Sequence, residues 1–190
     1  MTERAHTMRN HRGEAVTLPE ERRREIVDYL KHQGAKTTEE LAALIDRSQA
    51  ILDDLLSGMT EEQAAFRPDP DQWSVKDVLA HIDASLHGTA RIIEATARGE
   101  RPSARSADPA SVGSSDASLD ELRDRVEEAY RRVRETVLDL GPDPDLSVTV
   151  RHPFFDELNC KEWAAFIYLH CGRDHTNQIQ QIMAHPGFPR

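Results

Sequence analysis

The sequence has few cysteines and no long apolar run. Only Cys160 and Cys171 occur among its 190 residues. Two cysteines are too few for a disulfide framework, and we expect both to be thiols in a reducing compartment. No stretch approaches the roughly 20 apolar residues of a membrane helix, and the polar start MTERAHTMRNHRGEAV lacks the apolar segment of a signal peptide. These absences predict a cytoplasmic protein with no membrane partner.

Several motifs of familiar chemistry are also missing. The nine glycines never cluster into a phosphate-binding loop or a dinucleotide fingerprint, and there is no CxxC, HExxH or GxSxG. Acidic residues outnumber basic ones by 34 to 24, which gives a formal net charge of -10. Because this charge repels phosphate backbones, we predict no nucleic-acid partner.

Helical periodicity is abundant. Apolar residues recur at intervals of three, four and seven in four long segments, about residues 38–59, 74–99, 118–140 and 161–184. Helices of roughly 20 to 25 residues would be about 30 to 37 Å long, which suits an antiparallel bundle. We therefore predict an all-α protein built on a four-helix bundle.

The remaining segments complete the predicted organisation. We expect a flexible N-terminus over residues 1–17, an extra N-terminal helix and turn over 18–37, and the bundle domain over 38–185. Residues 99–117 are small and polar without periodicity, which indicates a mobile loop. Residues 146–150 alternate in polarity, but this short run is too isolated to predict a sheet.

Residues 22–45 also resemble the first two helices of a winged helix-turn-helix DNA-binding domain. The third helix of such a domain should be basic, because it lies in the DNA groove. The segment DRSQAILDDLL instead has three aspartates and one arginine. This composition favours an N-terminal helix packed on the outside of the bundle.

The candidate functional residues are histidines and one cysteine. LHCGRDHTNQIQQI places His170, Cys171 and His175 within six positions of a helical segment. In a regular helix, positions four apart differ by about 40° and positions five apart by about 140°. Cys171 and His175 would then share a face that excludes His170. A π-bulge would bring positions five apart into register, and Gly172 lowers its cost.

A third ligand would have to come from another helix. His81, in WSVKDVLAHIDASLHG, lies at the edge of the apolar stripe of the second helical segment. Bundle cores build metal sites from side chains on facing helices. His81 is therefore the candidate, whereas His87 and His152 have only weak support from their sequence context.

Taken in order, these motifs resemble those of the DinB-like (YfiT-like) metalloenzyme superfamily. The resemblance rests on WSVKDVLAHI after a proline-rich turn, on HPFFDELNCKEWAAFIYLH and on DHTNQIQQI, and it covers about residues 38–184. It implies an up-down-down-up four-helix bundle that holds a divalent metal, commonly zinc or nickel, with three histidines. His81 and His175 match two of these ligands.

The resemblance leaves the middle ligand open. Counting back four residues from His175, the usual ligand spacing, gives Cys171, whereas counting seven forward from Trp163 gives His170. A regular helix would make a site of two histidines and one thiolate, and a bulge near Gly172 would make a site of three histidines. The third alternative is that the site has been lost.

The implied activity is the transfer of a low-molecular-weight thiol to an electrophilic small molecule, with isomerisation or hydrolysis as related reactions. Zinc with three protein ligands can bind a thiol or water and lower its pKa. Asp174 and Asn177 are candidates to hold a ligand in place, and relatives suggest a homodimer. The alternative is a non-catalytic, stress-related or partner-binding bundle with a degenerate metal site.

Overall fold

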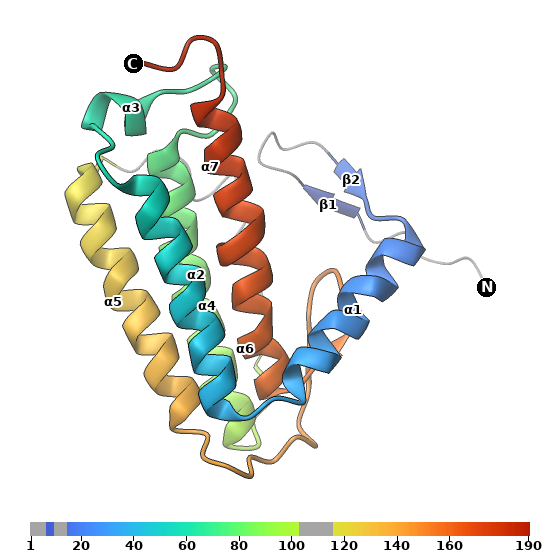
Figure 1. Cartoon of the computed structure of the whole chain (residues 1–190). Coiled ribbons are helices and arrows are strands. Elements are labelled where there is room, and N and C mark those ends of the chain that lie inside the picture. Colours follow the sequence, from blue (N-terminus) through green and yellow to red (C-terminus); the bar gives the residue numbers. More distant parts are fainter. Residues whose placement is uncertain (1–6, 10–14, 103–115) are drawn as a thin grey trace.

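The computed structural model describes residues 7–9, 15–102 and 116–190, and the protein is mostly helical (Figure 1). Three of the long elements are continuous helices: α2 (Thr38–Leu56), α4 (Val75–Ala97) and α5 (Leu119–Leu138). The fourth is composite and consists of α6 (Cys160–Leu169), a π-helical turn (His170–His175) and α7 (Thr176–Met183). Two further helices are α1 (Glu20–Gly34) and α3 (Glu61–Ala65).

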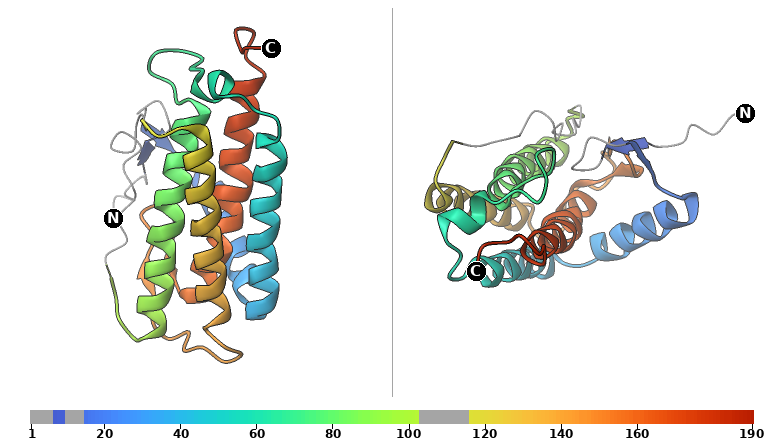
Figure 2. Two further views of the ribbon diagram at one scale, coloured as in Figure 1. Left: turned by 90° about the vertical axis from the view of Figure 1, so that its left-hand side faces the viewer. Right: turned by 90° about the horizontal axis from the view of Figure 1, so that it is seen from above.

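The long helices form a four-helix bundle with up-down-down-up topology. In Figure 1, α2 runs upward, α4 and α5 both run downward, and the composite helix α6–α7 runs upward. Both α2 and α4 pack against α5 and α6, so α2 and α4 occupy opposite corners of the bundle (Figure 2). The predicted fold is therefore confirmed, including the extra N-terminal helix α1, which packs against α6.

Every bundle helix begins at a capping box, in which a polar side chain and the residue three positions later satisfy each other's backbone N–H groups. The four pairs are Thr37 with Glu40, Ser74 with Asp77, Ser118 with Glu121, and Asn159 with Glu162. These caps fix where each helix starts, and hence which residues face the core.

The apolar stripes meet in one continuous core. Leu52, Leu86 and Ile93 are fully buried, as their periodicity predicts. The core also contains a polar contact, because the hydroxyl groups of Ser48 and Tyr130 lie 2.8 Å apart and join α2 to α5 by a hydrogen bond. None of the helices in the described ranges is long and apolar enough to cross a membrane.

Two elements differ from the sequence-based expectation. The segment ending at Val150 does take part in a sheet: β3 (Val150–Arg151) pairs antiparallel with β4 (Glu157–Leu158). The partner strand follows after a short connection, which the backbone hydrogen bond from His152 N–H to Asp156 O closes at 3.0 Å. The helix α3 was also not expected, because a single turn has too few residues to show periodicity.

The N-terminal segment contains two short strands. β1 (Thr7–Arg9) pairs antiparallel with β2 (Ala15–Thr17), within the stretch expected to be flexible. The rest of residues 1–17 lies outside the described residues, as does most of the expected mobile loop at 99–117. Residues 46–56 continue α2 without a break, so no separate third helix of a helix-turn-helix domain is present there.

Candidate metal centre

His81 is positioned by the start of α4. The capping box of Ser74 and Asp77 fixes the first turn, and Arg67 forms an ion pair with the buried Asp77 carboxylate at 2.8 Å. His81 follows the cap by seven residues, or about two turns, and therefore faces the same way as Ser74. The Trp73 ring packs on the imidazole of His81 with centroids 5.2 Å apart. The WSVKDVLAHI motif thus encodes both the histidine and its support.

The composite helix positions the other two histidines. Residues 170–175 form a π-helical turn, in which each hydrogen bond spans one residue more than in an α-helix. This extra residue brings His170 and His175, five positions apart, onto one face. The Thr176 hydroxyl donates a hydrogen bond to the Gly172 carbonyl at 2.9 Å, which satisfies an acceptor within the turn. The helix therefore contains the π-bulge that a site of three histidines requires, rather than the regular turn that a site with Cys171 requires.

Gly172 allows the π-helical turn to lie against α2. A Cβ atom at this position would come within 2.7 Å of Ser48 Oγ and 2.9 Å of Ser48 Cβ. Real Cβ atoms do not make such short contacts, and Ser48 is itself held by its hydrogen bond to Tyr130. The close approach of α2 thus requires glycine at the centre of the turn.

The three histidines converge on one point. His170 Nε2 lies 3.2 Å from His81 Nε2 and 3.2 Å from His175 Nε2. One ligand nitrogen from each histidine lies within 4.8 Å of the others, so the triad could hold a metal ion. His81 and His175 are buried, and His170 is partly accessible to solvent. The Ser85 hydroxyl lies 3.3 Å from His81 Nε2, one helical turn away.

A hydrogen bond to Gln178 sets the proton position on His175. Gln178 Oε1 lies 3.0 Å from His175 Nδ1, and because an amide oxygen only accepts, Nδ1 carries the proton. The lone pair of His175 is therefore on Nε2, which points at the other two rings. Gln178 belongs to the DHTNQIQQI motif, but its sequence position alone did not reveal this role. The Nδ1 atom of His81 has no hydrogen-bond partner among the described residues.

The surroundings keep these imidazoles neutral. Burial, together with the smaller effect of the neighbouring His175 ring, lowers the pKa of His81 to about 3. Desolvation likewise places the pKa of His170 well below its usual range, with His175 and His81 as additional causes. Neutral imidazole is the form that donates a lone pair to a metal, so both rings are in the ligating state at neutral pH.

Aromatic side chains enclose the triad on the α6 side. The Phe166 ring stacks on His170 with centroids 5.0 Å apart and an interplanar angle of 16°. On its other side Phe166 contacts the buried ring of His152, at a centroid distance of 4.6 Å. His152 also stacks on Phe155 and packs against Trp163. The sequence context of His152 gave it only weak support and did not predict this position.

The other sequence candidates lie apart from the triad. Cys171 is buried, and its sulfur does not belong to the group of converging ligand atoms. Burial raises the pKa of its thiol, which disfavours the thiolate. Asp174 is exposed and contacts Arg173 at 3.6 Å, and Asn177 is exposed as well. Gln178, rather than either of these two, contacts His175.

The donor set fits a divalent metal ion. Imidazole rings that bring lone pairs together repel one another unless a proton or a cation lies between them. On a tetrahedral ion with metal–nitrogen distances of about 2.0 to 2.1 Å, neighbouring ligand nitrogens lie about 3.3 Å apart. Two of the nitrogen pairs lie at 3.2 Å. The Gln178 contact is of the kind that orients metal-binding histidines in proteins.

Known structures share this fold. YfiT from Bacillus subtilis, described as a probable metal-dependent hydrolase with an unusual four-helix bundle topology, is similar with a TM-score of 0.65 and 15% identity, over 91% of this chain and 92% of that chain. TT2238, described as a four-helix bundle protein, is similar with a TM-score of 0.57 and 24% identity, over 76% of this chain and 99% of that chain. At these identities the likeness shows the fold alone.

Sequence comparison gives the family. No curated protein matches the chain. The family model of the DinB superfamily matches residues 44–179, which include all three histidines of the triad and most of the bundle. The match covers more than half of the chain and agrees with the topology and with the motifs described above. The chain therefore belongs to the DinB superfamily.

Proposed function

We propose that the protein is a divalent-metal-dependent enzyme that transfers a low-molecular-weight thiol to an electrophilic small molecule, with His81, His170 and His175 as the metal ligands. The observation that carries the proposal is the convergence of three imidazole nitrogens from two helices. A metal ion bound there by three protein ligands would lower the pKa of a thiol or water that it binds and so supply a nucleophile at neutral pH.

The residues around the triad have distinct roles in this proposal. Gln178 holds the Nδ1 proton of His175, and Trp73 and Phe166 pack on His81 and His170 and keep water away from these rings. The Ser85 hydroxyl, 3.3 Å from His81 Nε2, is placed to hydrogen-bond to a nucleophile beside the triad. The chain thus supplies binding, orientation and desolvation.

Hydrolysis is the second candidate reaction, because the same site would activate water. The similar fold of YfiT, a probable metal-dependent hydrolase, favours this reaction. A non-catalytic bundle with a degenerate site is the remaining alternative. What supports an enzyme over that alternative is that three ligands meet and that Gln178 orients one of them.

The test is metal-dependent turnover. Protein loaded with zinc or nickel is mixed with cysteine or glutathione and 1-chloro-2,4-dinitrobenzene, and in parallel with an activated ester and no thiol. Thiol transfer predicts thioether formation that depends on the metal and is lost in His81→Ala. Metal-dependent ester cleavage without thioether formation would instead favour the hydrolase. Equal rates for wild type, His81→Ala and metal-free protein in both assays would contradict the proposal.

A further inference from the structure

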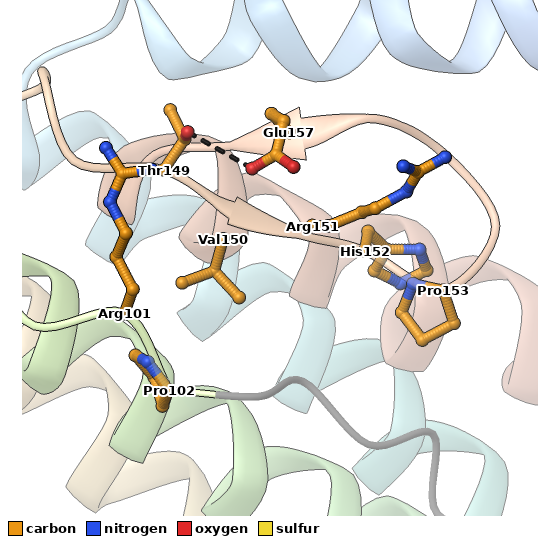
Figure 3. A pocket seen from close by; sticks show the side chains of 8 residues that line it. All are labelled: Arg101, Pro102, Thr149, Val150, Arg151, His152, Pro153 and Glu157. Atoms are coloured by element: carbon orange, nitrogen blue, oxygen red, sulfur yellow. Dashed lines mark hydrogen bonds between the residues drawn. The ribbon is translucent and has the colours of Figure 1, made fainter.

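A pocket lies between the β3–β4 hairpin and the segment that follows α4 (Figure 3). Its volume is about 540 Å³, within the range of small-molecule sites in proteins. Val150, Pro102 and Pro153 give it an apolar lining, and its polar groups come from Thr149, Glu157, His152 and two arginines. The pocket shares no residue with the proposed metal ligands.

The two arginines are the chemical feature of this pocket. Neither Arg101 nor Arg151 forms an ion pair or a side-chain hydrogen bond with another residue of the described ranges. Glu157, the cross-strand neighbour of Arg151, accepts a hydrogen bond from Thr149 Oγ1 at 3.2 Å. Two guanidinium groups against one carboxylate leave the pocket positive, on a chain whose net charge is -10. Guanidinium groups with free donors recognise carboxylates and phosphates.

The arrangement of these side chains suits an elongated ligand. In Figure 3, the Arg101 side chain extends to the level of Thr149, whereas Arg151 lies at the opposite end, near His152 and Pro153. Val150 is buried in the core and, because successive side chains of a strand alternate, it faces away from Arg151. A molecule with an acidic group at each end matches the separation of the two arginines.

His152 links the pocket to the triad. Its ring lines the pocket and also contacts Phe166, with centroids 4.6 Å apart. Phe166 in turn stacks on His170, with centroids 5.0 Å apart. Two aromatic rings, His152 and Phe166, therefore lie between the pocket and a proposed metal ligand.

We propose that this pocket binds a small organic acid, with a dicarboxylate favoured over a monocarboxylate. The inference goes beyond the proposed function, because the pocket is separate from the triad. Arg101 and Arg151 hold the carboxylates. Arg101 and Arg151 act here as specificity-determining residues.

The direct test is a titration of the full chain with succinate, followed by NMR of labelled histidine side chains at constant ionic strength. The His152 signal is identified by its absence in His152→Phe. We expect a saturable shift of the His152 signal with succinate and none with succinamide, its neutral analogue. In the Arg101→Gln/Arg151→Gln double variant the dissociation constant should rise at least tenfold.

The matched control is Arg91→Gln, which removes an exposed arginine of α4 outside the pocket and should bind succinate like wild type. Thermal melting checks that the double variant is folded, as expected for two exposed side chains. The proposal is overturned by a wild type without a saturable His152 shift, by equal shifts with succinamide, or by a folded double variant that binds like wild type.

The titration separates this inference from the proposed function when it uses protein stripped of metal on a chelating resin, together with His81→Ala. If succinate binds to metal-stripped wild type and to His81→Ala, but wild type binds no metal, the pocket proposal stands and the enzyme proposal is rejected. If wild type binds metal but succinate causes no shift of the His152 signal, only the pocket proposal is rejected.

Discussion

The chemistry of the triad depends on which nitrogen of each imidazole carries its proton. For His175 the contact with Gln178 Oε1 decides this, because the amide oxygen needs a donor. His81 has no such acceptor at Nδ1 among the described residues, so its orientation depends on packing against Trp73. His175 is thus the proposed ligand whose lone pair is best oriented in the absence of a metal.

Replacing Gln178 with leucine tests this role. The change keeps a similar volume but removes the acceptor for His175 Nδ1–H, so the ring can rotate or change tautomer. We expect metal affinity to fall about 10- to 100-fold with little loss of helicity, as measured by competition with a metal-binding dye. Gln180→Leu makes the same chemical change at an exposed position of α7 and should bind like wild type. Equal affinities for the two variants would contradict the role of Gln178.

His152 should make stability depend on pH. Burial among aromatic rings lowers its pKa to about 3, whereas an unfolded histidine has a pKa of about 6.5. Between these values only the unfolded state takes up the proton, so the native state loses stability as pH falls from about 7 toward 3. This one group should reduce the free energy of unfolding by about 2 kcal/mol between pH 8 and pH 5.

Urea unfolding of metal-free protein at the two pH values measures this effect. His152→Phe should show a pH 8 to pH 5 difference smaller than that of wild type by about 2 kcal/mol. His32→Gln, a change at an exposed position of α1, should retain the wild-type difference. An unchanged difference in His152→Phe would mean that this imidazole titrates normally in the native state.

At the scale of elements, the π-helical turn is the feature on which the site depends. In a regular helix His170 and His175 would differ by about 140°, and Cys171 would share the face of His175. The turn instead places both histidines against His81. Three contacts stabilise it. Gly172 allows α2 to approach closely, the Thr176 hydroxyl donates a hydrogen bond to the Gly172 carbonyl, and Phe166 stacks on His170.

Gly172→Ala tests the contact between the turn and α2. Helix propensity alone would favour alanine by up to about 1 kcal/mol, but the new Cβ would lie 2.7 Å from Ser48 Oγ. We expect a net destabilisation of about 1 to 3 kcal/mol in chemical unfolding, together with weaker metal binding. A Gly172→Ala variant as stable as wild type would show that the turn does not depend on this contact.

Two variants sharpen that experiment. Gly88→Ala in α4, where a Cβ meets no atom within 4 Å, should be neutral or slightly stabilising. Ser48→Gly removes the side-chain atoms that a Cβ at position 172 would meet, so the double variant should be less destabilised than the sum of the two single changes. Strict additivity would indicate that the two residues do not interact.

The sequence predicted the regular elements much better than this irregular one. Periodicity and capping residues located the helices, because a buried stripe and a satisfied helix start both leave a local pattern. The choice between Cys171 and His170 could not be made from the sequence, because it depends on how closely Ser48 of α2 approaches Gly172. The β3–β4 pair was missed because two-residue strands carry too short a pattern.

At the scale of the whole molecule, the triad joins two helices. His81 comes from α4 and the other two histidines from the composite helix, so a bound metal would cross-link segments about 90 residues apart in the chain. The bundle itself could be predicted from its four long amphipathic segments. Its up-down-down-up topology was predicted from the resemblance to the DinB-like superfamily, because the connector lengths alone allow more than one topology.

Metal binding should therefore raise thermal stability. A ligand at a concentration of 100 times its dissociation constant stabilises the native state by about 2.7 kcal/mol, which corresponds to about 5 to 10 °C in melting temperature for a chain of this size. Differential scanning fluorimetry with zinc and with nickel measures the shift. His81→Ala should show none, and a shift of equal size in that variant would indicate binding elsewhere.

The central claim is that His81, His170 and His175 hold one divalent metal ion. Its most direct test is metal stoichiometry by elemental analysis of untagged protein, purified without chelator and incubated with zinc or nickel, beside single alanine variants. We predict about one metal per chain in wild type and in Cys171→Ala, and none in His81→Ala, His170→Ala or His175→Ala. No metal in wild type, or its loss in Cys171→Ala and retention in His170→Ala, would contradict the account.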